Sequence, residues 1–113
     1  MGLYQVYVVE LSKKVFTEDK KFREANPQYN GVLECLYVGM TSKDPTRRFK
    51  EHKEKLMSKK GHYLSSSIVK KYGLYLRPSL YAHIDRGNKK RILEEERKLA
   101  LSLRKKRYAV WFN

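Results

Sequence analysis

The chain has 113 residues, enough for one domain, and Cys35 is its only cysteine, which rules out an internal disulfide and a cysteine-based zinc site. No run of about 18 apolar residues is present, so we expect no membrane span and an intracellular, cytoplasmic location. The 26 Lys and Arg against 12 Asp and Glu give a net charge of +14, which attracts polyanions, of which nucleic acid is the commonest inside a cell.

The first half of the chain predicts two strands and then a basic helix. Residues 3–11 (LYQVYVVEL) and 32–40 (VLECLYVGM) are rich in β-branched and aromatic residues, so we expect two antiparallel strands. Between them, residues 13–31 are charged and broken by Asn-Pro and Asn-Gly, which indicates an inserted loop with room for a helical turn. The Asp-Pro pair at 44–45 is typical of a helix start, and this helix should run to about Ser58.

The second half predicts two more helices and two strand-like pieces. We expect a short helix over residues 62–72, between two glycines, and a long helix over residues 89–106 with an asparagine as its cap. Residues 74–84 indicate a strand or two strand pieces, because Pro78 cannot donate to a central ladder, and residues 108–112 form a terminal strand-like piece. The order β-β-α-α-β-α-β predicts a single α/β (α+β) domain with a mainly antiparallel sheet and helices packed on it.

The long helix carries a carboxylate in an unusual place. With residues placed at 100° intervals, Glu96 falls in the middle of an apolar arc, whereas Glu94 points almost opposite and Glu95 lies just outside. The arc consists of Ile92, Leu93, Leu99, Ala100 and Leu103. Such a carboxylate is costly to bury unless it meets a cation, a metal or a hydrogen-bond network. The structural alternative is pairing with a lysine or tyrosine at the edge of the core.

The basic helix places Arg48 and His52 four residues apart on one face, beside an apolar arc. Arg48 could instead be one more surface charge, and His52 a half-buried neutral ring. Phosphodiester hydrolysis needs charge neutralisation, a base that activates water and an acid that protonates the leaving oxygen. Glu96 could hold a hard divalent ion, Arg48 the scissile phosphate, and His52 or a tyrosine could relay a proton.

Taken together, these residues resemble the GIY-YIG nuclease superfamily. Tyr7, in QVYVVEL, matches the tyrosine of the first half-motif, and the segment 37–39 (YVG), followed by Met-Thr, is a close variant of the second. Arg48 and His52 match the arginine helix in its R-x-x-x-H form, and Glu96 matches the metal-binding glutamate of a later helix. The similarity spans nearly the whole chain.

The resemblance implies a three-stranded antiparallel sheet flanked by helices and a metal-dependent endonuclease that hydrolyses DNA. It implies Tyr7 as the base for the attacking water, with Tyr37 and His52 assisting, and Arg48 on the phosphate. Glu96 would hold the divalent ion, Mg²⁺ or Mn²⁺.

The expected nucleic-acid contacts surround these catalytic candidates. Gly39 would permit a close backbone approach, and the basic residues would attract DNA through its phosphates. The full set is Gly39, Thr41, Lys43, Arg47, Lys50, Lys53 and Asn113, of which Asn113 is the candidate for an asparagine that many family members carry. Two departures are present, because Gln5 replaces the glycine of the first half-motif and 30 residues separate Tyr7 from Tyr37.

Two other functions stay open at this point. The first is a non-catalytic nucleic-acid-binding module on the same scaffold, because a fold does not guarantee an activity. The second is a basic protein-interaction or ribosome-associated domain. For the nuclease, we expect binding mainly through DNA phosphates, with specificity supplied by DNA shape or by a partner protein, and a nuclear or nucleoid association. The sequence does not determine an oligomeric state.

Overall fold

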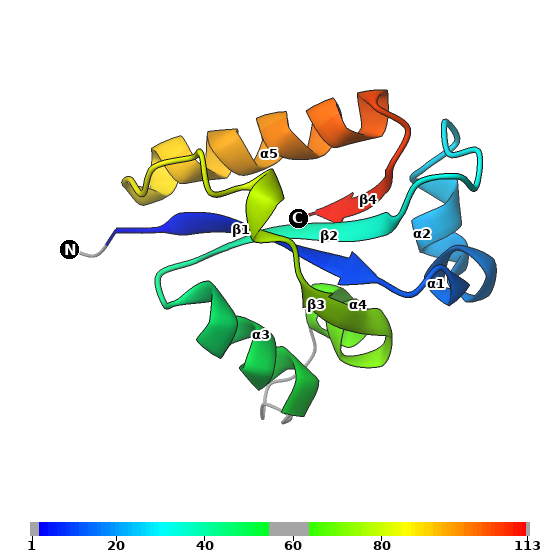
Figure 1. The fold of residues 1–113 in the computed structure, drawn as a ribbon, viewed down its shortest axis with the longest axis horizontal. Coiled ribbons are helices and arrows are strands. Elements are labelled where there is room, and N and C mark those ends of the chain that lie inside the picture. Colours follow the sequence, from blue (N-terminus) through cyan, green and yellow to red (C-terminus); the bar gives the residue numbers. More distant parts are fainter. Residues whose placement is uncertain (1–2, 55–63, 113) are drawn as a thin grey trace.

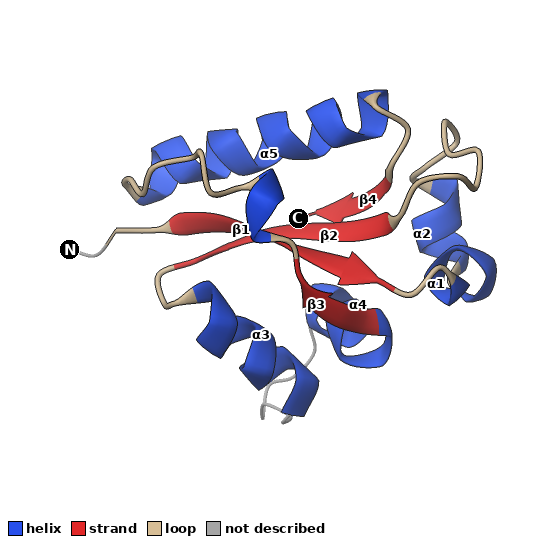
Figure 2. Cartoon of the chain, viewed as in Figure 1, coloured by secondary structure: helices blue, strands red, loops and turns tan. Residues whose placement is uncertain are grey.

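The computed structural model describes residues 3–54 and 64–112, except for the side chains of 51–54 and 64–66. The order of elements begins with β1 (Gln5–Leu11), two short helices and β2 (Cys35–Thr41). The chain continues through two helices, a third strand and a 3-10 helix to the long C-terminal helix and the last strand. The predicted α+β class is confirmed (Figure 2).

The described part of the chain forms one four-stranded sheet rather than the expected three-stranded one. The strand order is β3-β1-β2-β4, with β3 at Gly73–Leu76 and β4 at Ala109–Phe112. β1 is antiparallel to β2, as predicted, and also to β3, whereas β4 is parallel to β2. The last strand can pair in this direction because a long helix, α5 (Lys89–Lys105), returns the chain across the sheet before β4 begins.

Helices cover both faces of the sheet. Figure 1 shows α5 on one side, and α3 (Pro45–Glu54) and α4 (Leu64–Tyr72) on the other. The packing agrees, because α5 contacts β2, β4 and β1, whereas α3 and α4 contact each other, β1 and β3. The two central strands are therefore buried from both sides, which explains why their apolar residues run almost continuously instead of alternating. Of the helices in the described ranges, none is long and apolar enough to span a bilayer.

Three predicted elements need correction or completion. The charged insertion contains two short helices, α1 (Lys14–Glu18) and α2 (Lys20–Glu24), instead of a loop with one helical turn. The predicted strand at 74–84 ends at Leu76, and the chain then forms the 3-10 helix η1 (Pro78–Leu80), because Pro78 has no N–H for a ladder. The expected end of α3 near Ser58 lies outside the described residues.

The helix starts follow the predicted capping. The Asn88 side chain accepts a hydrogen bond of 2.8 Å from the Arg91 N–H at the start of α5. The Asp44 carboxylate accepts one of 3.3 Å from the Arg47 N–H at the start of α3. One residue of the predicted apolar arc of α5 is not buried. Leu93 is 47% exposed, because it lies at the outer edge of the arc.

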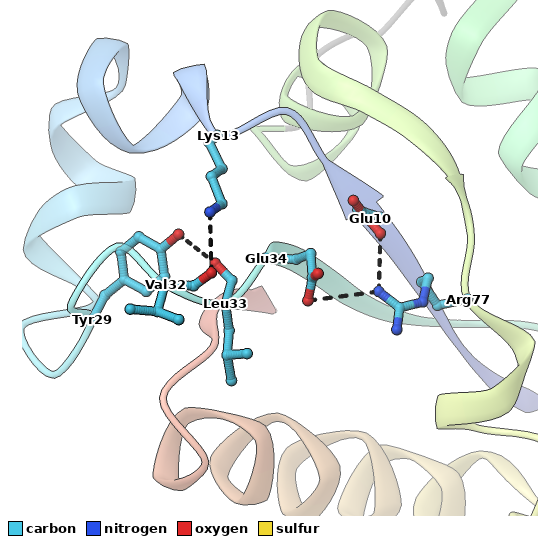
Figure 3. A network of polar contacts seen from close by, with 7 residues as sticks. All are labelled: Glu10, Lys13, Tyr29, Val32, Leu33, Glu34 and Arg77. Carbon is cyan, nitrogen blue, oxygen red and sulfur yellow. Dashed lines mark hydrogen bonds and ion pairs between the residues drawn. The ribbon is translucent and has the colours of Figure 1, made fainter.

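Polar contacts tie the inserted segment and the strand ends together (Figure 3). Arg77, which follows β3, bonds the Glu10 carboxylate of β1 at 2.9 Å and lies 3.8 Å from the Glu34 carboxylate before β2. The Lys13 ammonium donates to the carbonyl oxygens of Gly31 and Val32 at 3.2 and 3.1 Å. These contacts hold the entry to β2 beside the end of β1.

Asn26 fixes the added strand β4 to the insertion. Its side chain is completely buried, and its amide donates to the Phe22 carbonyl at 2.8 Å. Its amide oxygen accepts from the Val110 N–H at 2.7 Å and from the Gln28 side chain at 3.2 Å. A buried amide with both ends hydrogen-bonded makes the C-terminal strand depend on the insertion.

We predict that Asn26→Ala lowers the free energy of unfolding by about 3 kcal/mol, because it leaves buried backbone groups of Phe22 and Val110 without their partner. Urea unfolding followed by circular dichroism measures this loss. Asn30→Ala, which removes a hydrogen bond to the exposed Val32 N–H, is the control and should cost less than about 1 kcal/mol. Equal losses for the two variants would contradict the role given to Asn26.

Candidate functional site

Two tyrosines from neighbouring strands meet above one glycine. In the β1–β2 register, Tyr7 lies opposite Gly39 and Val9 lies opposite Tyr37, so all four residues point to one face of the sheet. The two tyrosine rings are 6.0 Å apart between centroids and tilted by 58°. Both are buried, with exposed fractions of 1% for Tyr7 and 3% for Tyr37.

Gly39 provides the space for the two hydroxyl groups. A Cβ atom at this position would lie 2.9 Å from the Tyr37 hydroxyl oxygen, 3.0 Å from that of Tyr7, and 2.8 Å from the Cε2 atom of Tyr37. Both hydroxyls therefore lie directly over the backbone of residue 39. The glycine of the second half-motif is required here by contact, not by an unusual backbone angle.

Arg48 joins the tyrosine pair from α3. Its position follows from the start of α3, where the Arg48 N–H donates to the Asp44 carbonyl at 3.0 Å. The half-buried Arg48 guanidinium and the Tyr37 hydroxyl are the hydrogen-bond partners of the Tyr7 side chain. Tyr7, Tyr37 and Arg48 therefore form one cluster, which lies on the α3 side of the sheet.

The environment of Tyr7 determines its protonation. Burial raises the pKa of the Tyr7 phenol well above its usual value of 10, and the neighbouring Tyr37 raises it further. The Arg48 guanidinium opposes both effects, because a cation favours the phenolate. Since the raising causes prevail, Tyr7 is a neutral phenol near pH 7. It can take a proton from water only while it passes its own proton on.

Glu96 is buried on α5. Its exposed fraction is 1%, and it lies in the buried stripe of the helix with Ile92, Ala100 and Leu103, as the helical pattern predicted. α5 and α3 lie on opposite sides of the sheet (Figure 1), and Glu96 is not among the residues that line the pocket beside Arg48. The association of Glu96 with the tyrosine cluster stays a prediction.

An open pocket lies at the end of the sheet where β1 begins and β2 ends. It has a volume of about 210 Å³, and it joins the start of β1, the end of β2 and the first turn of α3. Its lining consists of Tyr4, Met40, Thr41, Ser42, Lys43 and Arg48. Met40 pairs with Val6, and Thr41 pairs with Gln5, so residues from both faces of the sheet line the pocket.

The other predicted contact residues are placed as follows. Thr41 is 6% exposed, and its hydroxyl accepts a hydrogen bond of 2.9 Å from the Lys43 N–H. Lys43, Arg47 and Lys50 are exposed around the start of α3. The backbone of residues 52 and 53 belongs to α3, but the side chains of His52 and Lys53 lie outside the described part, as does Asn113.

Glu96 is the residue to which the family resemblance assigns a metal ion. Among the described residues, no group of three or more His, Cys, Asp or Glu side chains could hold a metal ion. Mg²⁺ does not need such a group, because it keeps several waters and uses one or two carboxylates together with phosphate oxygens. A single carboxylate at Glu96 therefore fits Mg²⁺ in donor chemistry.

Sequence reasoning missed Tyr4 as a residue of the pocket. It stands just before β1 and belongs to the same tyrosine-rich stretch as Tyr7, but nothing in its spacing separates it from a core residue. Comparisons of the chain with protein-family models, with curated proteins and with solved structures gave no match.

We predict that Gly39→Ala costs about 1–3 kcal/mol of stability, because the new methyl group forces the Tyr37 ring to move in a packed core. Urea unfolding measures the cost, and the near-ultraviolet circular dichroism of the tyrosines should change. In a Tyr37→Leu background, which removes the Cε2 and hydroxyl atoms, the same substitution should cost less. An equal cost in both backgrounds would show that Tyr37 does not occupy this space.

We also predict a specific response to alkaline pH. A phenol whose pKa is raised by folding favours the folded state less as pH rises above about 10, the pKa in the unfolded chain. The free energy of unfolding should therefore fall above pH 10, and Tyr7→Phe should make this fall shallower. Urea unfolding between pH 8 and pH 11.5 gives both slopes. If the free energy of unfolding falls equally steeply with pH in the wild type and in Tyr7→Phe, the raised pKa given to Tyr7 is contradicted.

Proposed function

We propose that this protein is a metal-dependent endonuclease that hydrolyses DNA phosphodiester bonds by a GIY-YIG-type mechanism. The observation that carries the proposal is the meeting of Tyr7, Tyr37 and Arg48 over Gly39, beside an open pocket. Tyr7 is 30 residues from Tyr37 in sequence, and the residues match the order of the family motifs.

The cluster contains groups suited to phosphate chemistry. Arg48 lines the pocket, where its guanidinium can hold a phosphate oxygen and offset the charge that develops on it during attack. Tyr7 takes the proton of the attacking water while it passes its own hydroxyl proton to Tyr37, its hydrogen-bond partner, and Tyr37 passes its hydroxyl proton on to the leaving oxygen of the phosphodiester. This relay leaves neither phenol charged for long, which fits the raised pKa of Tyr7.

Glu96 is the proposed ligand for Mg²⁺ or Mn²⁺. When bound, the ion supplies neutralisation of the negative charge on the phosphate. Glu96 comes from the α5 side and Arg48 from the α3 side, and of the two only Arg48 lines the pocket, so the joint action of both residues is part of the proposal. The burial of Glu96 supports a specific role, because an ordinary surface glutamate has no need of an apolar helix face.

The surface charge suits a DNA backbone. The net charge is +14, and exposed Lys43 lines the pocket, while exposed Arg47 and Lys50 lie on α3. Phosphate contacts of this kind bind without sequence specificity and weaken steeply with salt. We therefore place the protein with DNA inside the cell, with specificity supplied by DNA shape or by a partner protein.

A non-catalytic binding module remains the second candidate. The observation in its favour is that Tyr7 and Glu96 are almost completely buried, with 1% exposed each, so neither side chain is open to a substrate in this structure. A binder would need the cationic surface but neither of these groups.

Incubation with supercoiled plasmid tests the proposal. We predict nicking in Mg²⁺ or Mn²⁺ and none in chelator, with rates at least about 100-fold lower for Glu96→Gln and Arg48→Ala, because each removes a group that stabilises developing charge. Glu94→Gln and Arg97→Ala are the matched controls, since they make the same chemical changes at exposed positions of α5 to which no role in the site is given.

The outcomes separate the two candidates. Nicking that survives Glu96→Gln would exclude Glu96 as the metal ligand. DNA binding without nicking in any metal, equal for the wild type and Glu96→Gln, would establish the non-catalytic module.

A further inference from the structure

The pocket beside Arg48 has two chemically different sides. Tyr4 and Met40 form an apolar side, and both are half-buried and packed against the hydrophobic core. The opposite lining is polar and cationic, with Thr41, Ser42, Lys43 and Arg48. A nucleotide has the same division, because its phosphate is anionic whereas its base presents a flat π-face.

Tyr4 is held firmly in its place. Its N–H donates to the Gly87 carbonyl at 2.7 Å, and the Gly87 N–H donates back to the Tyr4 carbonyl at 3.0 Å. The loop that carries Gly87 is itself fixed, because the Arg91 guanidinium donates to the carbonyl oxygens of Asp85 and Arg86 at 2.6 and 3.0 Å. Because these bonds fix the backbone that carries Tyr4, binding of a ligand there needs no ordering of the main chain.

We propose that Tyr4 stacks against an unpaired base of the nucleotide whose phosphate Arg48 holds. This inference rests on the proposed function for the position of the phosphate, and it names the substrate as DNA that is single-stranded or locally unpaired at the bound nucleotide. In a continuous duplex, both faces of a base are covered by its neighbours, so an aromatic wall can engage only a base that has left the stack.

The open shape of the pocket agrees with this role. Stacking platforms for single strands lie in shallow cationic grooves and accept any base, because every base has a π-face. Here the platform and the cations line one pocket of about 210 Å³. A purely duplex-binding surface would need the cations alone.

Binding measured in chelator, by fluorescence anisotropy, tests the inference. The probes are a labelled 12-nucleotide oligo-dT strand, the same strand with abasic sites in place of bases, and a 12-base-pair duplex. Tyr4→Ala should weaken binding of oligo-dT about 5- to 150-fold, the range expected for loss of one stacked base. It should leave the abasic strand and the duplex unchanged, and Tyr4→Phe should restore oligo-dT binding to within about two-fold of the wild type.

Tyr75→Ala is the matched control, because Tyr75 is 53% exposed on β3 and does not line the pocket. It should bind all three probes as the wild type does. If Tyr4→Ala does not fold, the wild-type protein still tests the inference. It should bind oligo-dT about 5- to 150-fold more tightly than the abasic strand, and equal affinities would overturn the inference.

An equal loss of affinity for all three probes would overturn the inference, because it would mark Tyr4 as structural. So would an unchanged affinity of Tyr4→Ala for oligo-dT. Since no cleavage occurs in chelator, these results are independent of the nicking experiment. If Tyr4→Ala shows the loss of stacking but the wild type does not nick plasmid, the proposed nuclease activity is refuted and the stacking inference stands.

Discussion

The candidate site depends on the register in which β1 pairs with β2. That register sets Tyr7 opposite Gly39 and Tyr37 opposite Val9, so two phenols share the space that a missing side chain leaves. Because the period of a strand is two residues, a slip of one residue in either strand would turn the tyrosine of that strand to the other face, away from its partner. The buried apolar residues on both faces of the two strands oppose such a slip.

The same burial limits the chemistry of the site. Burial in the core raises the pKa of the Tyr7 phenol, so Tyr7 is not ionised near pH 7 and cannot act as a preformed phenolate base. Of its hydrogen-bond partners, Tyr37 can accept its proton, whereas the Arg48 guanidinium can only donate. The polar groups that face solvent lie next to the cluster, in the pocket at the strand ends. The function proposed above uses both parts, with the surface groups on the phosphate and the buried tyrosine pair as the proton relay.

Much of this arrangement could be predicted from local pattern. The apolar stripe of α5 placed Glu96 in the buried face, and the capping residue Asn88 located the start of the helix, because both depend on neighbours along the helix. The parallel pairing of β4 could not be predicted in this way. It depends on where α5 delivers the chain and on Asn26, which is 84 residues distant from Val110 in sequence. Tyr4 was missed for the same reason, because the bridge to Gly87 brings two distant segments together.

The central claim is that Tyr7 and Arg48 act as one unit on the phosphate, and a double-mutant cycle on the nicking rate tests it most directly. Residues that act together lose activity non-additively, because the second substitution removes a contribution already lost. We expect the Tyr7→Phe and Arg48→Ala double variant to nick plasmid about as slowly as the slower single variant. A double variant whose loss equals the product of the two single losses would contradict the central claim.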